Sequence, residues 1–373
     1  MFSYLMPTDI RFGKSCLKAL KGIVSDRKIK RPLIFTGRAG AEKSGALKEV
    51  IKRLSNTSPI IFNKINPNPT IESLKEGLRI SRKNNADMIV AIGGGSVIDY
   101  AKAVSVLSKQ KQGLNDFFYK NRRLNKEKVF FVAISTTFGT SSEITPYAVM
   151  TDKLGGGKTT LADESMFPDI AFTDPGFTLT MPKPIVAVSC ADLLTHSIEA
   201  YWSINSNILT DYFAEQAISL FLRYYKKTYQ NPMNLKIRQQ LSLASLFAGL
   251  AFSNTRTTAC HSISYPMTAI FNIPHGIACA LTLGEMLGFN YTNNHQKILA
   301  LCRIMNCNNI KKAKQKISTI LSDLNVHRDL RSYGISRKDL HLIVEKGFTP
   351  SRMKANPRRV RKKDLYNILV KIY

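Results

Sequence analysis

A purely apolar run at residues 88–92 leads directly into three consecutive glycines at residues 93–95. Such a run is typical of a short strand that is buried on both faces, and parallel sheets covered by helices contain strands of this kind. The segments 31–37 and 129–134 have the same character. Because helical periodicity separates these runs, the first half of the chain predicts an α/β domain with a mostly parallel sheet.

The second half of the chain has a different pattern. It shows long helical periodicities, for example over 211–225 and 237–251, and few β-branched runs. This pattern predicts an all-α domain. Because prolines interrupt both kinds of element just beyond residue 181, we expect an α/β domain at 1–181 and an all-helical domain at 182–373.

The chain is strongly basic, with 54 Lys and Arg against 26 Asp and Glu and a formal net charge of +28. Such an excess can mark a nucleic-acid surface or a site for an acidic substrate. The basic residues are spread along the chain apart from a run at 358–363, and no zinc-finger, helix-turn-helix or aromatic RNA-binding pattern accompanies them. A nucleic-acid-binding protein is therefore the weaker alternative, and we expect no nucleic-acid partner.

No segment contains the roughly 18 to 20 consecutive apolar residues that cross a bilayer, so we expect no membrane partner. The N-terminus lacks the basic-then-apolar layout of a signal peptide. Six scattered cysteines without a CxxC pair suit reduced thiols. These features together predict a cytoplasmic protein.

The glycine cluster predicts a phosphate-binding turn. Glycines between a buried strand and a helix let backbone N–H groups approach a phosphate, and the helix N-terminus adds partial positive charge. Gly94, Gly95 and Ser96, followed by Asp99, have this context and are candidates to bind the pyrophosphate of a dinucleotide. The same glycines also fit a tight strand-to-helix turn that binds nothing.

A second loop follows the next predicted strand and is rich in hydroxyl groups. Thr136, Thr137 and Thr140 belong to it and are candidate partners for ribose and phosphate oxygens. An ordinary turn explains this loop equally well when it is taken alone. The carboxyl ends of parallel strands, however, lie at one edge of the sheet, which is where open α/β sheets bind ligands.

The second half contains a candidate metal site. Asp192 and His196 are spaced i and i+4, which places a carboxylate and an imidazole on one helix face. His261 and His275 bracket an apolar segment, and buried imidazoles are costly unless they are paired or ligated. Three histidines and one carboxylate suit Fe(II) or Zn. A capping aspartate and core histidines are the alternative interpretation of the first pair.

These motifs resemble the iron-containing (group III) alcohol dehydrogenase family. The resemblance covers essentially the whole chain, from residues 12–14 and 66–70 to residues 356–358, and includes the segment Pro274-His275-Gly276. It implies a Rossmann-like N-terminal domain that binds the dinucleotide and an all-helical C-terminal domain for metal and substrate, as in the dehydroquinate synthase architecture. It also implies a cleft between them that holds NAD(P)H and the metal.

The implied activity is metal-dependent, NAD(P)H-linked oxidation of a small alcohol or reduction of a small aldehyde, in a homodimer. The family's roles are transferred residue by residue: the pyrophosphate to Gly94, Gly95 and Ser96, other cofactor contacts to Thr136, Thr137 and Thr140, the ribose to Lys158, and the metal to Asp192, His196, His261 and His275. A lyase of the dehydroquinate synthase type, which also uses NAD and metal, is the alternative enzyme.

Two departures from the family pattern bear on chemistry. Where the family commonly has an aspartate that selects NAD, this chain has Gly37 followed by Arg38, so we expect that NADPH is accepted or preferred. Where the family often has a further histidine near the nicotinamide, this chain has Tyr265. Two interpretations of this residue stay open: a hydroxyl that donates a proton to a developing alkoxide, and a ring that packs against the nicotinamide.

The segment 255–266 is similar to its counterpart in phosphonoacetaldehyde reductases. It contains Arg256, whose planar guanidinium suits a phosphonate, sulfonate or carboxylate. We therefore expect an anionic aldehyde as substrate, while a salt bridge at the surface or between domains remains the alternative role for this arginine.

Overall fold

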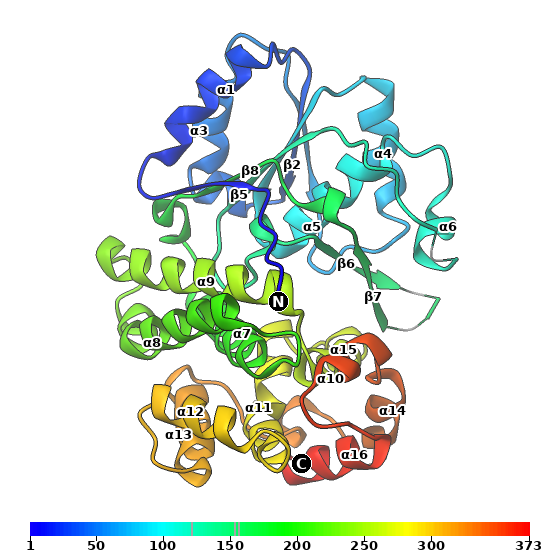
Figure 1. The fold of residues 1–373 in the computed structure, drawn as a ribbon. Helices are drawn as coiled ribbons and strands as arrows, with labels where there is room; N and C mark the ends of the chain where they lie inside the picture. Colours follow the sequence, from blue (N-terminus) through cyan, green and yellow to red (C-terminus); the bar gives the residue numbers. More distant parts are fainter. Residues whose placement is uncertain (121, 153, 156) are drawn as a thin grey trace. The chain divides into compact units, whose positions relative to one another are not determined.

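The computed structural model describes residues 1–120, 122–152, 154–155 and 157–373. The chain divides into two compact units (Figure 1). One comprises Met6–Thr180, and the other comprises Met181–Tyr373 together with Met1–Leu5.

The first unit is built on a six-stranded sheet with the order β1-β8-β5-β4-β2-β3, and all neighbouring strands pair in parallel. Its strands are β1 (Asp9–Phe12), β2 (Pro32–Gly37), β3 (Ile60–Ile65), β4 (Met88–Gly93), β5 (Phe130–Ser135) and β8 (Ile170–Thr173). Strands β6 (Tyr147–Asp152) and β7 (Gly157–Ala162) form a separate antiparallel pair. The predicted parallel sheet is confirmed, and β2, β4 and β5 coincide with the three apolar runs.

Helices cover both faces of this sheet, which explains why its central strands lack polar residues. They are α1 (Leu20–Asp26), α2 (Gly40–Lys43), α3 (Ala46–Arg53), α4 (Leu74–Lys83), α5 (Gly95–Leu107) and α6 (Leu114–Phe118). Alternate residues of β4 serve different faces: Ile89 packs in the core formed with α4 and α5, and Val90 in the core formed with α1 and α3. Both side chains are fully buried.

The strand order reverses direction between β2 and β4. Strand β3 lies on the outer side of β2, whereas β5 and β8 follow on the far side of β4. Gly37 and Gly93 therefore end neighbouring strands at the carboxyl edge of the sheet. A reversal of this kind is where doubly wound sheets bind their ligands.

In the described part beyond residue 181 every regular element is helical, so the predicted all-α domain is confirmed. The α-helices are α7 (Lys183–Trp202), α8 (Ile208–Gln230), α9 (Leu235–Thr255), α10 (Ala259–Ala269), α11 (His275–Tyr291), α12 (His295–Ile304), α13 (Ile310–Asp323), α14 (Asp339–Lys346), α15 (Pro350–Ala355) and α16 (Lys362–Lys371). Helix α7 lies at the centre of this unit and contacts α8, α9 and α11.

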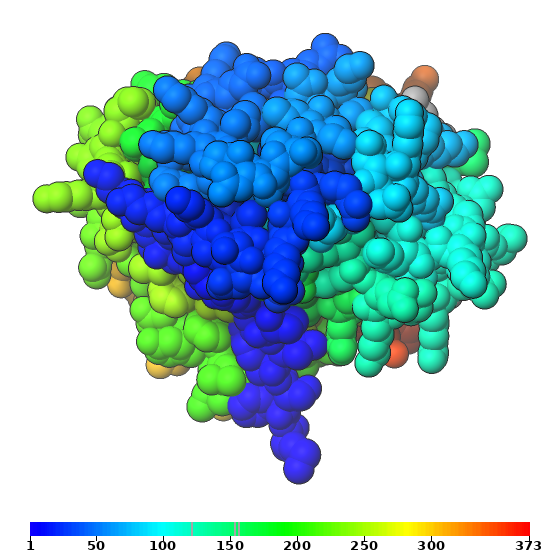
Figure 2. Space-filling view, turned by 90° about the horizontal axis from the view of Figure 1, so that it is seen from above, coloured from blue at the N-terminus to red at the C-terminus, as the bar shows by residue number. Residues whose placement is uncertain are grey.

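The first residues of the chain form an arm that projects at the surface in Figure 2, where it is dark blue. Hydrogen bonds attach this arm to α9. The Tyr4 hydroxyl donates to the carbonyl of Leu250, and the amide of Leu5 donates to the Asn254 side chain. None of the described helices is long and apolar enough to cross a membrane.

Candidate active site

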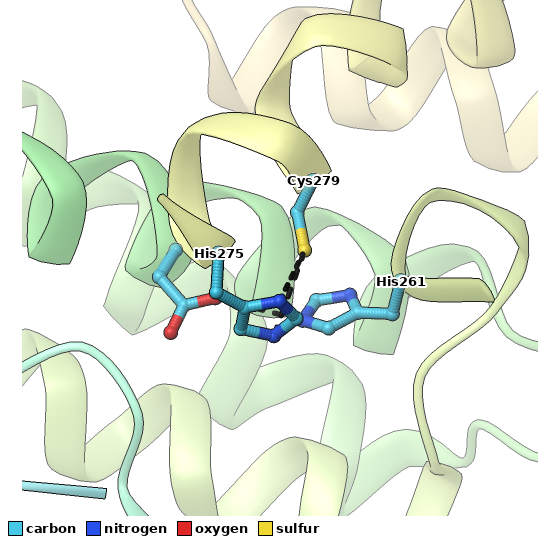
Figure 3. A group of neighbouring side chains, drawn as sticks. His261, His275 and Cys279 are labelled. Carbon is cyan, nitrogen blue, oxygen red and sulfur yellow. Dashed lines mark hydrogen bonds and ion pairs between the residues drawn. The ribbon is translucent and has the colours of Figure 1, made fainter. Parts of the chain in front are cut away.

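Three helices of the second unit bring together a compact group of metal-binding side chains. Helix α7 carries Asp192, helix α10 carries His261, and helix α11 carries His275 and Cys279. One nitrogen, oxygen or sulfur atom of each residue lies within 4.8 Å of the corresponding atoms of the others. Figure 3 shows the two imidazoles and the thiol side by side.

A glycine allows α11 to approach α7 closely. A Cβ atom placed on Gly276 would lie 2.1 Å from the carbonyl oxygen of Val188 and 2.7 Å from Cβ of Asp192. Any larger residue would therefore push apart the two helices that carry Asp192 and His275. This contact explains in physical terms the glycine of the segment Pro274-His275-Gly276.

Two atoms that face the group are buried without a hydrogen-bond partner among the described residues. They are Oδ1 of Asp192 and Nε2 of His261, which lie 3.6 Å apart. A buried polar atom left unpaired costs about 1–3 kcal/mol, so two that converge indicate a missing third partner. A divalent cation fits this donor set, because carboxylate, imidazole and thiolate groups are its usual ligands.

The electrostatics of the group favour an ionised carboxylate. Burial acts to raise the pKa of Asp192, but the neighbouring imidazoles of His196, His261 and His275 outweigh it and hold this pKa below its usual value. The Asp192 side chain therefore stays negatively charged and suited to bind a cation.

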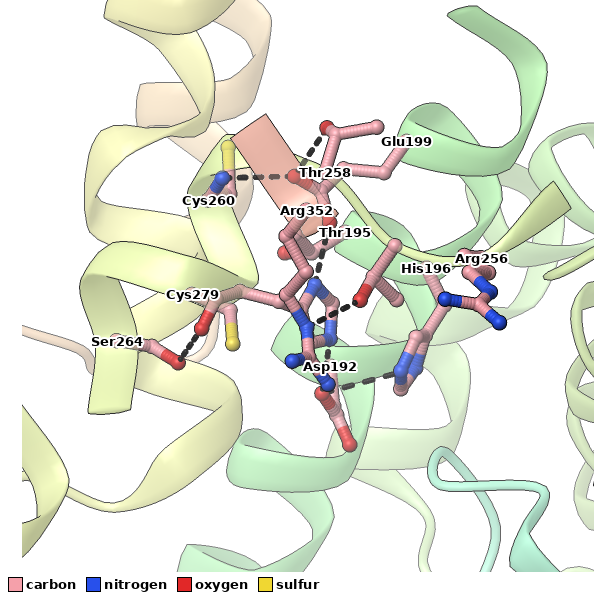
Figure 4. A network of polar contacts seen from close by, with 12 residues as sticks. Asp192, Thr195, His196, Glu199, Arg256, Thr258, Cys260, Ser264, Cys279 and Arg352 are labelled. Carbon is pink, nitrogen blue, oxygen red and sulfur yellow. Dashed lines mark hydrogen bonds and ion pairs between the residues drawn. The ribbon is translucent and has the colours of Figure 1, made fainter. Parts of the chain in front are cut away.

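Glu199 fixes the orientation of His261 by contacting the ring nitrogen that does not face the metal-binding group. Its Oε2 lies 2.5 Å from Nδ1 of His261, while its Oε1 accepts hydrogen bonds from the Thr258 hydroxyl and the Cys260 amide (Figure 4). Burial acts to raise the pKa of Glu199, but His261 and these donors lower it overall. The carboxylate thus holds the proton of His261 on Nδ1 and leaves Nε2 to face the group.

His196 borders this group. Its Nδ1 lies 3.6 Å from Oδ1 of Asp192, and its ring stacks on Phe252 with 4.1 Å between centroids. The structure therefore groups three of the four predicted ligands, Asp192, His261 and His275, with Cys279. His196 lies against this group but is not part of it.

Tyr265 lies next to the metal-binding side chains. It is 4% exposed, and its ring centroid is 6.2 Å from that of His275. The guanidinium carbon of Arg352 lies 4.6 Å from the Tyr265 ring centroid, and Nε of Arg352 donates to the Thr257 hydroxyl. A phenol therefore lies beside one imidazole of the group, and a cation lies over the ring of that phenol.

Arg256 has an unusual backbone conformation. It is exposed and follows the last residue of α9 with φ 62° and ψ 167°. This region is almost exclusive to glycine, and a side chain there costs on the order of 1–3 kcal/mol. Figure 4 shows Arg256 and Arg352 in the surroundings of Asp192 and His196.

In the first unit, the two predicted cofactor loops lie against each other at the carboxyl edge of the sheet. A Cβ atom on Gly94 would lie 2.9 Å from Oγ1 of Thr137, and one on Gly95 would lie 3.0 Å from Cγ2 of Thr140. The amide of Thr136 donates to the carbonyl of Gly93. A larger residue at Gly94 would force the Thr137 side chain to shift, and one at Gly95 would crowd the Thr140 side chain.

The remaining predicted cofactor residues have distinct surroundings. The Ser96 hydroxyl accepts a hydrogen bond from the Asn68 amide, and Nζ of Lys158 donates to the Asn68 side chain. The carboxylate of Asp99 instead accepts from the Ser142 hydroxyl and the amide of Val149, so it braces the second loop.

Arg38 is exposed directly after β2, where Gly37 ends the strand. A Cβ atom on Gly37 would meet its nearest atom at 3.5 Å, which is ordinary contact, so a Cβ atom is accommodated at this position.

Three residues near the metal-binding group were missed in the sequence. Glu199 follows Asp192 and His196 at positions i+7 and i+3, and Cys279 follows His275 at i+4, so helical spacing contains a signal for both. Arg352 is distant in sequence, and no local pattern marks it.

Comparisons with known proteins agree with this geometry. Residues 7–175 match the family model for iron-containing alcohol dehydrogenase, and residues 186–373 match the C-terminal model of the same family. An NADPH-dependent butanol dehydrogenase of Clostridium saccharobutylicum is 30% identical, over 100% of this chain and 98% of the relative. A 1,3-propanediol dehydrogenase of Citrobacter freundii is 28% identical, over 99% of this chain and 98% of the relative.

Solved structures give the same result. The sulfoacetaldehyde reductase of Bifidobacterium kashiwanohense in complex with NAD⁺ has a TM-score of 0.93 and 26% identity, over 100% of this chain and 98% of that chain. A 1,3-propanediol oxidoreductase has a TM-score of 0.92 and 27% identity, over 100% of both chains. The chain belongs to the iron-containing alcohol dehydrogenase family and is an NAD(P)-dependent oxidoreductase that acts on CH–OH groups.

Proposed function

We propose that this enzyme interconverts a small anionic aldehyde and its alcohol, using NADPH or NADH and a divalent ion bound by Asp192, His196, His261 and His275. The observation that carries the metal site is the convergence of Oδ1 of Asp192 and Nε2 of His261, two buried ligand atoms that make no hydrogen bond among the described residues. When bound, the ion polarises the carbonyl group and the reduced nicotinamide supplies hydride.

The residues of the chain orient and protect this chemistry. Glu199 keeps the His261 ring in one tautomer and one orientation, because a carboxylate behind a ligating imidazole fixes both. The metal-binding side chains are mostly buried, which excludes water and strengthens electrostatic interactions.

Tyr265 is proposed to supply the proton that the alcohol oxygen gains. Its nearly complete burial beside His275 and its contact with the Arg352 guanidinium support this role. If the tyrosine only packs, Tyr265→Phe will keep kcat and the pH profile of the wild type. Proton donation predicts a fall in kcat and a changed profile at alkaline pH in that variant.

The anionic end of the substrate is assigned to Arg256 and Arg352. A strained backbone conformation at an exposed arginine persists where the surrounding structure holds it, and such strain gathers at functional sites. Arg352 adds a second guanidinium beside Tyr265. The name of one structural relative, a sulfoacetaldehyde reductase, supports an anionic aldehyde as the substrate class.

The test compares phosphonoacetaldehyde and sulfoacetaldehyde with butanal in wild type, Arg256→Gly and the surface control Arg337→Ala. Glycine relieves the backbone strain at position 256, so a loss of activity cannot come from misfolding of that turn. Loss of a charged hydrogen bond predicts a fall in kcat/KM of about 10- to 100-fold for the anionic aldehydes alone. An equal effect on butanal would remove the anion assignment.

The cofactor is proposed to lie against Gly94, Gly95 and Ser96 and the threonine loop, with Lys158 near the ribose. The place of Gly37 and the exposed Arg38 supports acceptance of the extra phosphate of NADPH. Comparing KM for NADPH and NADH in wild type and Arg38→Ala tests this preference. A KM for NADPH that is unchanged by the substitution would contradict it.

A homodimeric assembly and a cytoplasmic location also belong to the proposal. The family resemblance and the composition support them. Light scattering after size-exclusion chromatography measures the oligomeric state. Fractionation of the source cells measures the location.

A further inference from the structure

Cys279 belongs to the metal-binding group by position. It lies one helical turn after His275 on α11, so both side chains leave the same face of that helix. Its Sγ lies 3.8 Å from both ring nitrogens of His275 and is buried (Figure 3). The imidazole and the sulfur therefore face the same small volume.

The other side of this volume is lined by two ligand atoms, Oδ1 of Asp192 and Nε2 of His261, that make no hydrogen bond among the described residues. Both residues are only 3% exposed. An ion with ligand bonds of about 2.0–2.3 Å holds neighbouring ligand atoms at most roughly 3.5 Å apart. The separations of 3.6 Å between these two atoms and 3.8 Å between the sulfur and the imidazole are close to that value.

We propose that Sγ of Cys279 is a further ligand of the divalent ion that Asp192, His196, His261 and His275 bind. The proposal rests on the metal site of the proposed function and adds to it a sulfur ligand. The thiol loses its proton to solvent when the metal–sulfur bond forms, because the thiolate is the ligating form.

A sulfur ligand changes what the site selects. Thiolate is a soft ligand that favours zinc and iron over magnesium and manganese, which prefer oxygen. It also adds a second negative charge to that of Asp192, which binds a divalent cation more tightly. We therefore expect this chain to retain zinc or iron against competing magnesium.

The decisive test is X-ray absorption at the zinc edge of the full-length protein loaded with one equivalent of zinc. The wild type is expected to show a sulfur neighbour at about 2.3 Å, in addition to nitrogen and oxygen neighbours at about 2.0–2.2 Å. The sulfur neighbour is expected to vanish in Cys279→Ala and in Cys279→Ser. It is expected to persist in Cys302→Ala, which removes another buried cysteine from α12.

Zinc affinity, measured by competition with a chelator, gives a second readout. Loss of a direct ligand is expected to weaken zinc binding at least tenfold, since loss of an outer partner alone costs about 10- to 100-fold. Cys302→Ala is expected to bind zinc as the wild type does.

The possible failures separate the two claims. A zinc-loaded wild type with only nitrogen and oxygen neighbours overturns the sulfur ligand and leaves the metal site of the proposed function standing. A wild type that binds no stoichiometric zinc or iron overturns both. The spectrum of the wild type alone decides whether sulfur binds the ion. The proposal can therefore be overturned even if a Cys279 variant folds poorly.

Discussion

Oε2 of Glu199 lies 2.5 Å from Nδ1 of His261, and both residues are buried. This contact links α7, which carries Asp192 and Glu199, to α10, which carries His261. The orientation of one predicted metal ligand is therefore set by a residue on the helix that carries another.

The first prediction concerns this contact. Glu199→Gln keeps the size of the side chain but removes the charge that holds the proton of His261 on Nδ1. We expect metal affinity to fall by about 10- to 100-fold, because outer partners of ligating imidazoles have effects of that size. Isothermal titration with zinc measures it. An unchanged affinity in a folded variant would show that the contact is only structural.

The second prediction concerns the approach of α11 to α7. Gly276→Ala places a methyl group where the backbone oxygen of Val188 lies 2.1 Å away, so the helices must separate. Overpacking of this kind costs on the order of 1–3 kcal/mol, and it also moves His275 from Asp192. We expect lower thermal stability and weaker zinc binding.

A control on the same helix makes this prediction specific. A Cβ atom on Gly284 has its nearest neighbour at 4.0 Å, so Gly284→Ala should fold and bind zinc as the wild type does. Equal losses in both variants would attribute the effect to the helix rather than to the contact.

The third prediction concerns the cofactor loops. A methyl group in Gly94→Ala would lie 2.9 Å from Oγ1 of Thr137, so it would force the Thr137 side chain to move and would cover the backbone at the turn. We expect the dissociation constant for NADPH, measured by fluorescence titration, to rise by tenfold or more. Gly22→Ala, where a Cβ atom meets nothing within 4 Å, is the control. Tight NADPH binding by Gly94→Ala would argue against a pyrophosphate at this turn.

The fourth prediction concerns Glu143, which is 3% exposed behind the threonine loop. Burial raises the pKa of this carboxyl to about 7, although its own amide, Lys102 and Ser135 oppose the shift. Between its usual pKa of 4.5 and about 7, the folded protein binds more protons than the unfolded chain. The stability that protonated Glu143 contributes is therefore complete below the lower value and is lost as pH rises through the higher one.

Glu143→Gln cannot ionise, so its melting temperature relative to that of the wild type should increase as pH rises from 5 to 8. Scanning calorimetry at several pH values measures this difference. The exposed Glu127→Gln should show no such trend. A constant difference for Glu143→Gln across this range would contradict the raised pKa.

The sequence predicted those parts of the structure that depend on local pattern. The buried strands, the loops that follow β4 and β5, and the i, i+4 pair of Asp192 and His196 all have short-range signatures. The separate β6–β7 pair was missed because both strands are only partly buried and β7 is mostly polar. Strands β1 and β8 are four residues long, which is too short for a clear period.

The candidate site was predicted only in part, namely where its residues have a local signature in the sequence. Its histidines were identifiable because imidazoles in apolar segments need partners. Arg352 was not identifiable, because its place over Tyr265 arises from packing of distant helices. Asp99 has a structural contact that the sequence did not indicate. Its context in the sequence suggests a cofactor contact, and in the structure its carboxylate accepts hydrogen bonds from the Ser142 hydroxyl and the Val149 amide.

The central claim is that a divalent ion held by α7, α10 and α11 is required for the dehydrogenase reaction. The most direct measurement is metal content together with NADPH oxidation for anaerobically purified wild type, His261→Ala and His327→Ala, the last being an exposed histidine. We predict about one iron or zinc per chain and full activity in the wild type and His327→Ala, and loss of both in His261→Ala. Full activity in a folded, metal-free His261→Ala protein would contradict the claim.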